Sequence, residues 1–310
     1  MPDGTDAGAH HPPGVVVCVG LLTRDTIVPM PAWPEPDGRL VVDEILRSGG
    51  GPAATAAVAV ARLGGSAAFV GAVGDDGDEL VRALTDEGVD TTGVVRLRGA
   101  SPESVILLDR STGTRSILHV PGAALRELPT DAHDRCRTAA WVHVDHAGYR
   151  LAHALDRGRL SVDAGNPVAD LSLDGLGLYV PTATALAARY PGRMPRAAVA
   201  AALADGAQRV VVTEGARGAI AADRHGAWRV GGYEVDVVST LGAGDVFHGA
   251  LLAALTRGHD LAQATRRANV AAALSCRALD GRRAVPTLPE LEAAVAGTPD
   301  PEPILLQETA

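Results

Sequence analysis

Short runs of β-branched and other apolar residues recur along the chain, and helical patterns lie between several of them. Runs of this kind are typical of buried strands. The pattern predicts helices over residues 52–63 and 194–205, and strands over residues 15–19, 67–73, 139–144, 159–163, 177–180, 209–213, 218–222 and 233–238. Because strands that alternate with helices form parallel sheets with helices on both faces, the sequence predicts an α/β fold with three layers and a mainly parallel sheet.

Two regions interrupt this alternation. Residues 28–46 are rich in proline and end in the run RLVVDEIL, and residues 94–120 contain two apolar runs around a Ser-Thr-Gly turn. The second region is typical of a β-hairpin. We interpret both regions as a small β-lid on the α/β body, because both are strand-like without intervening helices. Such lids exclude water from transfer reactions. Ordinary edge strands of the main sheet are the alternative.

Composition narrows the possible chemistry. All 28 basic residues are arginine, and the absence of lysine excludes a lysine-containing phosphate loop and Schiff-base catalysis. A net charge of −9 without a basic run argues against a nucleic-acid partner. Three isolated cysteines without a Cys-x-x-Cys motif indicate a reducing, cytoplasmic setting. We expect one domain over residues 15–296, a disordered tail at 1–14, a loose tail at 297–310, no signal peptide and no membrane span.

The segment STLGAGDVFHGALLAAL, residues 239–255, carries the strongest chemical pattern. Gly242, Ala243 and Gly244 predict a tight turn ahead of a helix whose apolar stripe begins at Val246. Free N–H groups at the start of a helix bind anions, so this turn can hold a phosphate. Asp245 then has two interpretations: a favourable partner of the helix dipole, or a general base for a hydroxyl that attacks the bound phosphate.

A second glycine-rich helix start is GGGPAATAAVAVARLGG, residues 49–65. Three successive glycines let a ligand approach the backbone closely, and Pro52 suits the first turn of a helix. Alanine and valine on all sides of that helix predict that it is buried. The glycine turn is therefore either one wall of a ligand site or a place of tight packing.

These two segments resemble the C-terminal and N-terminal signatures of the PfkB, or ribokinase-like, carbohydrate kinases. Other segments resemble the family in the same order: GLLTRD at 20–25, GAVGDDGDEL at 71–80, VVTEGARG at 211–218 and the final helix and loop at 266–286. The resemblance covers about residues 15–287. It implies a ribokinase-like α/β/α sandwich with a β-lid, through which family members often form homodimers.

The resemblance also implies an activity, the transfer of the γ-phosphoryl group of ATP to a primary hydroxyl of a ketose-like sugar. Asp245 would be the base, and the turn Gly242–Ala243–Gly244 would stabilise the transferring phosphoryl group. The residues implied to contact the sugar are Asp25, Gly49, Gly50 and Gly51. Those implied to contact the nucleotide are Thr213, Gly215, Gly218 and Asn269. Mg²⁺ would bridge the phosphates of ATP.

The sequence departs from the family pattern at several places: Leu241 stands where threonine is frequent, Ala54 replaces the usual asparagine of the N-terminal signature, and two further departures concern bound ions. Ser239 stands where an aspartate commonly helps to form a monovalent cation site, which leaves K⁺ activation open. Residues 182–185 replace an Asn-x-x-Glu segment linked to Mg²⁺ and contain no carboxylate, so no metal ligand is predicted. A non-catalytic regulator that binds a sugar or nucleotide is therefore one alternative, which the retained Asp245 disfavours. A nucleoside kinase of the same family is another, disfavoured because no aromatic cluster lies near the sugar motifs.

The sugar itself stays open among fructose, a sugar phosphate and sulfofructose. Several segments look most like sulfofructose kinases and fructokinase-type members. Arg39 is either a contact to a sulfonate, which arginine suits, or a solvated charge on the lid. His143 and His146 flank Asp145 and are interpreted as a metal site, as groups that face the sugar, or as satisfied loop histidines. Asp163 and Asn166 resemble a strand-end pair near the phosphates.

Overall fold

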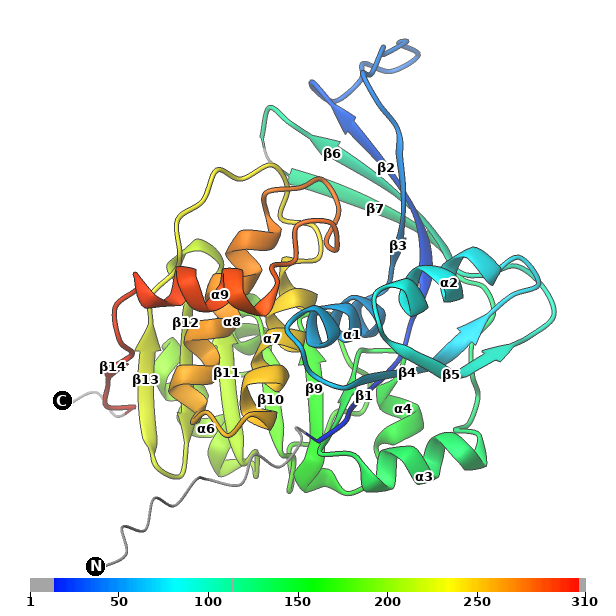
Figure 1. The fold of residues 1–310 in the computed structure, drawn as a ribbon. Helices are drawn as coiled ribbons and strands as arrows, with labels where there is room; N and C mark the ends of the chain where they lie inside the picture. The colour runs from blue at the N-terminus through cyan, green and yellow to red at the C-terminus, as the bar shows by residue number, and fades with distance from the viewer. Residues whose placement is uncertain (1–13, 113, 307–310) are drawn as a thin grey trace, which may run out of the picture.

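The computed structural model describes residues 14–112 and 114–306, and it confirms the three-layer α/β fold (Figure 1). The main sheet has ten strands in the order β14-β13-β12-β11-β10-β9-β8-β1-β4-β5. In chain order these are β1 (Val16–Val19), β4 (Ala67–Val73), β5 (Asp90–Arg96), β8 (Trp141–Val144), β9 (Leu160–Ala164), β10 (Leu178–Pro181), β11 (Arg209–Thr213), β12 (Ala219–Asp223), β13 (Gly226–Val230) and β14 (Glu302–Pro303). The seven strands β11, β10, β9, β8, β1, β4 and β5, in that order across the sheet, are parallel, and β12, β13 and β14 continue the sheet with antiparallel pairing.

Helices cover both faces of this sheet and enclose one apolar core on each side. One face carries α1 (Pro52–Arg62), α2 (Asp78–Asp86), α7 (Ala243–Thr256), α8 (Leu261–Ser275) and α9 (Leu288–Ala296). The other carries α3 (Thr130–Thr138), α4 (Tyr149–Ala152), α5 (Ala183–Arg189) and α6 (Pro195–Ala204). Helices α1 and α7 approach closely because Gly249 has no side chain; a Cβ there would lie 2.3 Å from the carbonyl oxygen of Ala56. This packing fixes the two glycine-rich helix starts relative to each other.

A separate four-stranded sheet extends from the body as the predicted lid (Figure 1). Its order is β3-β2-β6-β7, with β2 (Thr23–Met30), β3 (Leu46–Gly50), β6 (Glu103–Asp109) and β7 (Thr114–Val120). The pairing of β6 with β7 confirms the predicted hairpin. The lid boundaries differ from the predicted 28–46 and 94–120: the lid begins at Thr23, residues 31–45 contain no strand, and residues 94–96 belong to the main sheet.

The predicted strand over residues 233–238 is wrong, because these residues form an irregular connection. The edge of the sheet beside β13 is instead taken by β14, whose residues pair with Trp228 and Arg229. The predicted loose tail is therefore also wrong up to residue 306: the amide of Ile304 donates to the carbonyl of Ala227 at 2.8 Å, and Asp300 pairs with Arg266 at 2.6 Å. Residues 1–13 and 307–310 of the predicted tails lie outside the described residues.

Membrane insertion by a helix finds no support in residues 14–112 and 114–306, where every helix is too short or too polar to cross a bilayer.

Candidate active site

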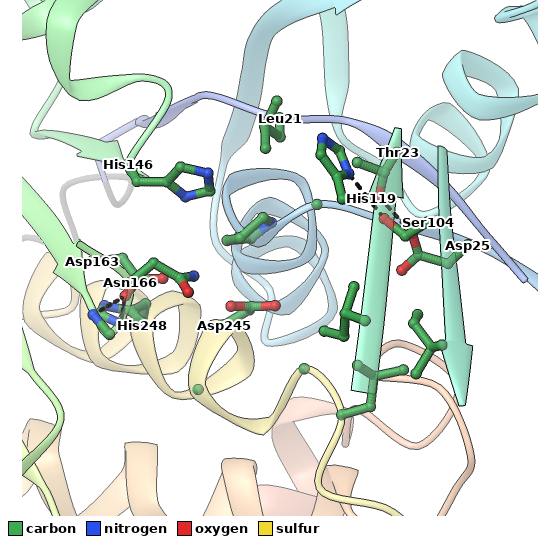
Figure 2. Close-up of a pocket in the computed structure, with 18 of the residues that line it drawn as sticks. Leu21, Thr23, Asp25, Ser104, His119, His146, Asp163, Asn166, Asp245 and His248 are labelled. Carbon is green, nitrogen blue, oxygen red and sulfur yellow. Dashed lines mark hydrogen bonds and ion pairs between the residues drawn. The ribbon is translucent and has the colours of Figure 1, made fainter. Parts of the chain in front are cut away.

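A cavity of about 490 Å³ lies where the carboxyl ends of the parallel strands meet the lid (Figure 2). Open α/β sheets bind ligands at this edge, because the loops that follow the strands converge there. The residues that line it are Leu21, Thr23, Asp25, Gly51, Pro52, Ser104, Ile106, Arg115, Ile117, His119, His146, Asp163, Gly165, Asn166, Val180, Thr182, Thr213, Leu241, Gly242, Gly244, Asp245 and His248. A smaller cavity beside it shares Asp25 and Asp245 and is also lined by Gly49 and Gly50.

The start of α7 has the tight glycine turn that the sequence predicted. Gly242 adopts a left-handed conformation (φ 75°) at the residue before the helix, and its Cα lies so close to Gly281 that a Cβ would approach the Gly281 Cα to 2.6 Å. The amide of Ala243 donates to the carbonyl of Thr240 at 3.3 Å. Within the described chain the amides of Gly242, Gly244 and Asp245 have no recorded acceptor. These three N–H groups are available to an anion at the helix start.

Asp245 lies in the first turn of α7, is half-buried, and points into the cavity (Figure 2). Burial, followed by the nearby Asp163 carboxylate, raises the pKa of Asp245 to about 7. A carboxyl group with this pKa accepts a proton readily near neutral pH, which suits a general base. Of the two interpretations, this environment favours the base over a simple partner for the helix dipole, because dipole stabilisation would lower the pKa of a carboxyl group.

Asp25 occupies the lid side of the cavity, on β2. The hydroxyl of Thr23 donates to Oδ1 of Asp25 at 2.7 Å. Oδ2 of Asp25 lies against Gly50, where a Cβ would come within 1.9 Å of it. Burial raises the pKa of Asp25, although the Thr23 hydroxyl opposes this shift. Gly50 is therefore needed for the position of the Asp25 carboxylate, which remains available to hydroxyl groups of a ligand.

Arg282 supports the glycine turn at residues 49–51 from behind, and the sequence patterns did not single it out. Its buried guanidinium donates to the carbonyl of Gly50 at 2.7 Å and to the hydroxyl of Thr55 at 3.2 Å. The neighbouring Gly281 packs against Gly242, as described above. Burial lowers the pKa of Arg282 to about 10, which leaves the group charged at neutral pH. The loop of Gly281 and Arg282 thus contacts both the turn at residues 49–51 and the turn before α7.

The lid strands β6 and β7 also contribute polar groups to the cavity. Ser104 Oγ lies 3.2 Å from Nδ1 of His119, and both residues line the cavity. Arg115 reaches across from β7, where its Nη1 donates to Oγ1 of Thr240 at 3.0 Å. This contact joins the lid to the turn before α7 and brings a positive charge close to Asp245.

The segment HVDH divides into three different environments. The ring of His146 lines the cavity. His143 is fully buried, with its Nδ1 3.3 Å from the hydroxyl of Ser161. Asp145 is also fully buried and accepts hydrogen bonds from the amides of Leu21 and Gly148, each at 2.8 Å. Asp145 thus fixes loops under the cavity, and within the described residues no group of three or more His, Cys, Asp and Glu side chains is placed to hold a metal ion.

Asp163 and Asn166 lie at the end of β9 and line the cavity, as the sequence suggested. Asp163 forms an ion pair with His248 of α7, with 3.2 Å between Oδ1 and Nε2. Thr182, at the start of the segment that lacks the expected carboxylate, lines the cavity and accepts from the amide of Ala185 at 3.1 Å. The sequence pattern did not predict the ion pair of Asp163 with His248, because these two residues lie far apart along the chain.

The residues expected at the nucleotide are only partly brought together. Thr213 lines the cavity, but Gly215, Gly218 and Asn269 are not among its lining residues. Gly218 packs tightly under β13, where a Cβ would lie 2.0 Å from the carbonyl oxygen of Val230. The side-chain amide of Asn269 donates through Nδ2 to the carbonyl of Gly231 at 3.1 Å. Arg39 lies in an exposed loop and is not a lining residue either.

Comparison with known proteins identifies similar sequences and structures among carbohydrate kinases. A sequence profile described as pfkB family carbohydrate kinase matches residues 15–157 and 190–288. The ATP-dependent ribose-1-phosphate kinase of Halopiger xanaduensis is 29% identical over 286 residues, which cover 88% of this chain and 95% of that protein. The aminoimidazole riboside kinase of Salmonella typhimurium is 30% identical over 275 residues, covering 78% of this chain and 86% of that protein. The structure of Arabidopsis thaliana ribokinase complexed with ribose and ATP has a similar fold, with a TM-score of 0.78, 24% identity, and coverage of 92% of this chain and 99% of that chain.

Proposed function

Since the chain belongs to the pfkB family of carbohydrate kinases, which are phosphotransferases, we propose that it transfers the γ-phosphoryl group of ATP to a primary hydroxyl of a ketose-like sugar. One observation carries this proposal: a proton-accepting carboxylate, Asp245, faces the cavity beside the free amides at the start of α7. Phosphoryl transfer needs these two groups together, since it depends on positioning and on stabilisation of charge.

The reaction follows from the positions of the residues. Asp25 orients the sugar from the lid side, and Asp245 takes the proton of the attacking hydroxyl. The hydroxyl oxygen forms a bond to the γ-phosphorus, the bond from that phosphorus to the bridging oxygen breaks, and ADP leaves with the electron pair. The amides of Gly242 and Gly244 stabilise the charge on the phosphoryl oxygens during transfer.

ATP as donor is supported by the names of two relatives, the ATP-dependent kinase of Halopiger and the ribokinase complexed with ribose and ATP. Thr213 and Thr182 line the cavity on the side of the strand ends and would face its phosphates. Mg²⁺ supplies charge neutralisation between the phosphates when bound. In the absence of a clustered ligand set in the described residues, we infer that the metal is held chiefly by the nucleotide and water.

The lid wall of the cavity supports an anionic sugar, that is a sugar phosphate or sulfofructose, as a candidate substrate in addition to neutral fructose. Arg115 and His119 extend from β7 into the wall of the cavity, and arginine binds phosphate and sulfonate oxygens well. Replacing Arg115 with methionine is expected to raise KM for an anionic sugar about tenfold or more, as loss of a charged hydrogen bond does, and to leave KM for fructose nearly unchanged. Equal changes for both sugars would contradict an anion contact by Arg115.

A nucleoside kinase is a second candidate, because one relative with 30% identity is named an aminoimidazole riboside kinase. Base recognition usually uses stacking on aromatic side chains, yet no Phe, Tyr or Trp lines the main cavity in the described part of the chain. A regulator that binds without transfer is the third candidate; the placement of Asp245 supports catalysis instead.

The test is ADP release by the purified chain with ATP and Mg²⁺ over a panel of neutral sugars, sugar phosphates, sulfofructose and nucleosides. We expect turnover with a sugar, and loss of about two to four orders of magnitude in kcat for Asp245→Asn, the usual effect of losing a general base. Turnover only with nucleosides would favour the second candidate. Tight sugar binding without ADP release by the wild type would favour the regulator.

We also propose a homodimer formed through the lid and action in the cytoplasm. Strand β7 is an edge strand whose Ile117, Leu118 and Val120 are more than half exposed, with values of 53, 55 and 63%. Exposed apolar edge strands pair readily with a second chain. The three cysteines are buried free thiols, which suits a reducing compartment. Light scattering on the wild type should give twice the chain mass, and a monomer would contradict the dimer.

A further inference from the structure

A buried group of ionisable side chains lies about one helical turn along α7 from the proposed base, and the reaction as described does not use it. His248 follows Asp245 by three residues on α7, so both project from the same side of the helix. His248 Nε2 pairs with Oδ1 of Asp163 at 3.2 Å. Its ring lies against that of His143, with 5.0 Å between the ring centroids. Figure 2 shows Asp163 and His248 together, with Asp245 next to them at the cavity.

Titratable and charged groups approach this cluster from four parts of the fold. Asp163 approaches from β9, His143 from β8, and Asp145 and His146 from the loop after β8. Arg115 approaches Asp245 from the lid. Among the cations, the ring of His248 influences the pKa of Asp245 most, ahead of Arg115, while both Asp163 and Asp145 disfavour the charged form of Asp245.

The partners of the two rings indicate which histidine carries the charge, because His248 pairs with the Asp163 carboxylate, whereas the hydrogen-bond contact of His143 within the described residues is the hydroxyl of Ser161. Nδ1 of His248 and Nε2 of His143 are buried and have no hydrogen-bond partner in the described structure. Burial, and then the proximity of His248, lower the pKa of His143 to about 3, so that ring is neutral. Burial opposes the charge on His248, but the Asp163 carboxylate outweighs it and raises the pKa of His248. Burial likewise opposes ionisation of Asp163, yet His248 holds the pKa of that carboxyl well below its usual range.

We propose that His248 is a positioning residue whose positive charge, held in place by Asp163, offsets the negative charge of that carboxylate beside Asp245 and so sets the pH at which the base becomes active. The inference rests on the proposed function in one respect, the role of Asp245 as general base. Without the imidazolium, an uncompensated carboxylate would stand beside the base and disfavour its ionised form.

The sign of the effect follows directly. A base must be deprotonated to act, so the rate rises with pH through the pKa of Asp245, which lies at about 7. His248→Gln removes the cation, so it raises the pKa of Asp245 and moves the acidic limb of the kcat/KM profile to higher pH, by about one unit for an adjacent buried charge. At pH values below the limb this shift lowers kcat/KM about tenfold relative to the wild type.

A second substitution distinguishes charge from packing. Adding Asp163→Asn to His248→Gln removes the uncompensated carboxylate, so the acidic limb should return close to the wild-type position. His143→Gln is the matched control: it changes a buried histidine in contact with the same ring, but a neutral one, and should leave the limb in place. Thermal unfolding of all variants reports any loss of folding separately.

The decisive experiment follows the ¹³C signal of the Asp245 carboxyl group during a pH titration of the ligand-free chain, with the signal assigned by its loss in Asp245→Asn. We expect an upward shift of the Asp245 pKa in His248→Gln, its reversal in the double variant, and no shift in His143→Gln. An unchanged Asp245 pKa in His248→Gln, or no reversal by Asp163→Asn, would overturn the inference. Because this titration needs no turnover, it stands even if the ADP-release panel fails, and that failure alone would count only against the proposed function.

Discussion

The raised pKa of Asp245 has a cost in stability that can be measured. An unfolded aspartate has a pKa near 3.8, and the folded group titrates at about 7. The folded state therefore binds the proton more tightly than the unfolded state. Its extra stability is complete below pH 3.8 and is lost as the pH rises to about 7. We accordingly expect Asp245→Asn, which carries no charge, to be more stable than the wild type at pH 8.

The magnitude follows from the shift. Three pKa units correspond to about 4 kcal/mol at 1.36 kcal/mol per unit. Asp245 faces a cavity that water enters and is only half-buried, so solvent screening should reduce the effect to ~2 kcal/mol. For a chain of 310 residues, ~2 kcal/mol raises the melting temperature by about 3 °C.

The assay is thermal and denaturant unfolding of the wild type and Asp245→Asn at several pH values from 4 to 8. The difference in unfolding free energy between them should grow with pH in favour of the variant and level off above pH 7. Asp86→Asn, a change at an exposed carboxylate of α2, should show no such growth. If the variant is less stable than the wild type at pH 8, or if the difference in unfolding free energy does not depend on pH, the argument that burial disfavours the ionised form of Asp245 is refuted.

Two further predictions concern glycines. Gly242→Ala should lower the free energy of unfolding by at least about 1 kcal/mol, because Gly242 has a positive φ and lies against Gly281. Gly244→Ala has open space around its Cβ, so its stability should stay within about 0.5 kcal/mol of the wild type, but kcat should fall because the methyl group enters the phosphate space. Chemical unfolding and ADP release check both variants, and equal stability losses would be evidence against this anion site. Gly50→Ala should displace the Asp25 carboxylate, since its Cβ would lie 1.9 Å from Oδ2, and should raise KM for the sugar much more than KM for ATP; an unchanged sugar KM would exclude Asp25 as a sugar contact.

The sequence predicted the parts of the site that local patterns specify. A glycine turn before an apolar helix stripe is visible within one short segment, so the start of α7 was predicted from the sequence, and Asp245 lines the cavity there. The glycine run at 49–51 could be read in the same way, and Gly51 lines the main cavity. The alternation of strands and helices was equally sufficient for the three-layer fold.

Contacts between distant segments could not be predicted in this way. Arg282 reaches Gly50 across more than two hundred residues, and the pair of Asp163 with His248 joins two elements whose register becomes clear only in the folded chain. The strand predicted at 233–238 failed for a related reason. Its residues have a strand-like composition, but a strand needs an open partner edge, and the edge of β13 is taken by a segment near the end of the chain.

The most direct measurement of the central claim is ³¹P NMR of the purified chain with ATP, Mg²⁺ and the sugar that gives turnover, for the wild type and for Asp245→Asn. We predict that a phosphomonoester signal of the sugar grows in step with ADP in the wild type and stays absent over the same period in the variant, while the variant still binds both ligands. Formation of the same sugar phosphate at the wild-type rate by Asp245→Asn would contradict the account, as would release of inorganic phosphate alone by the wild type.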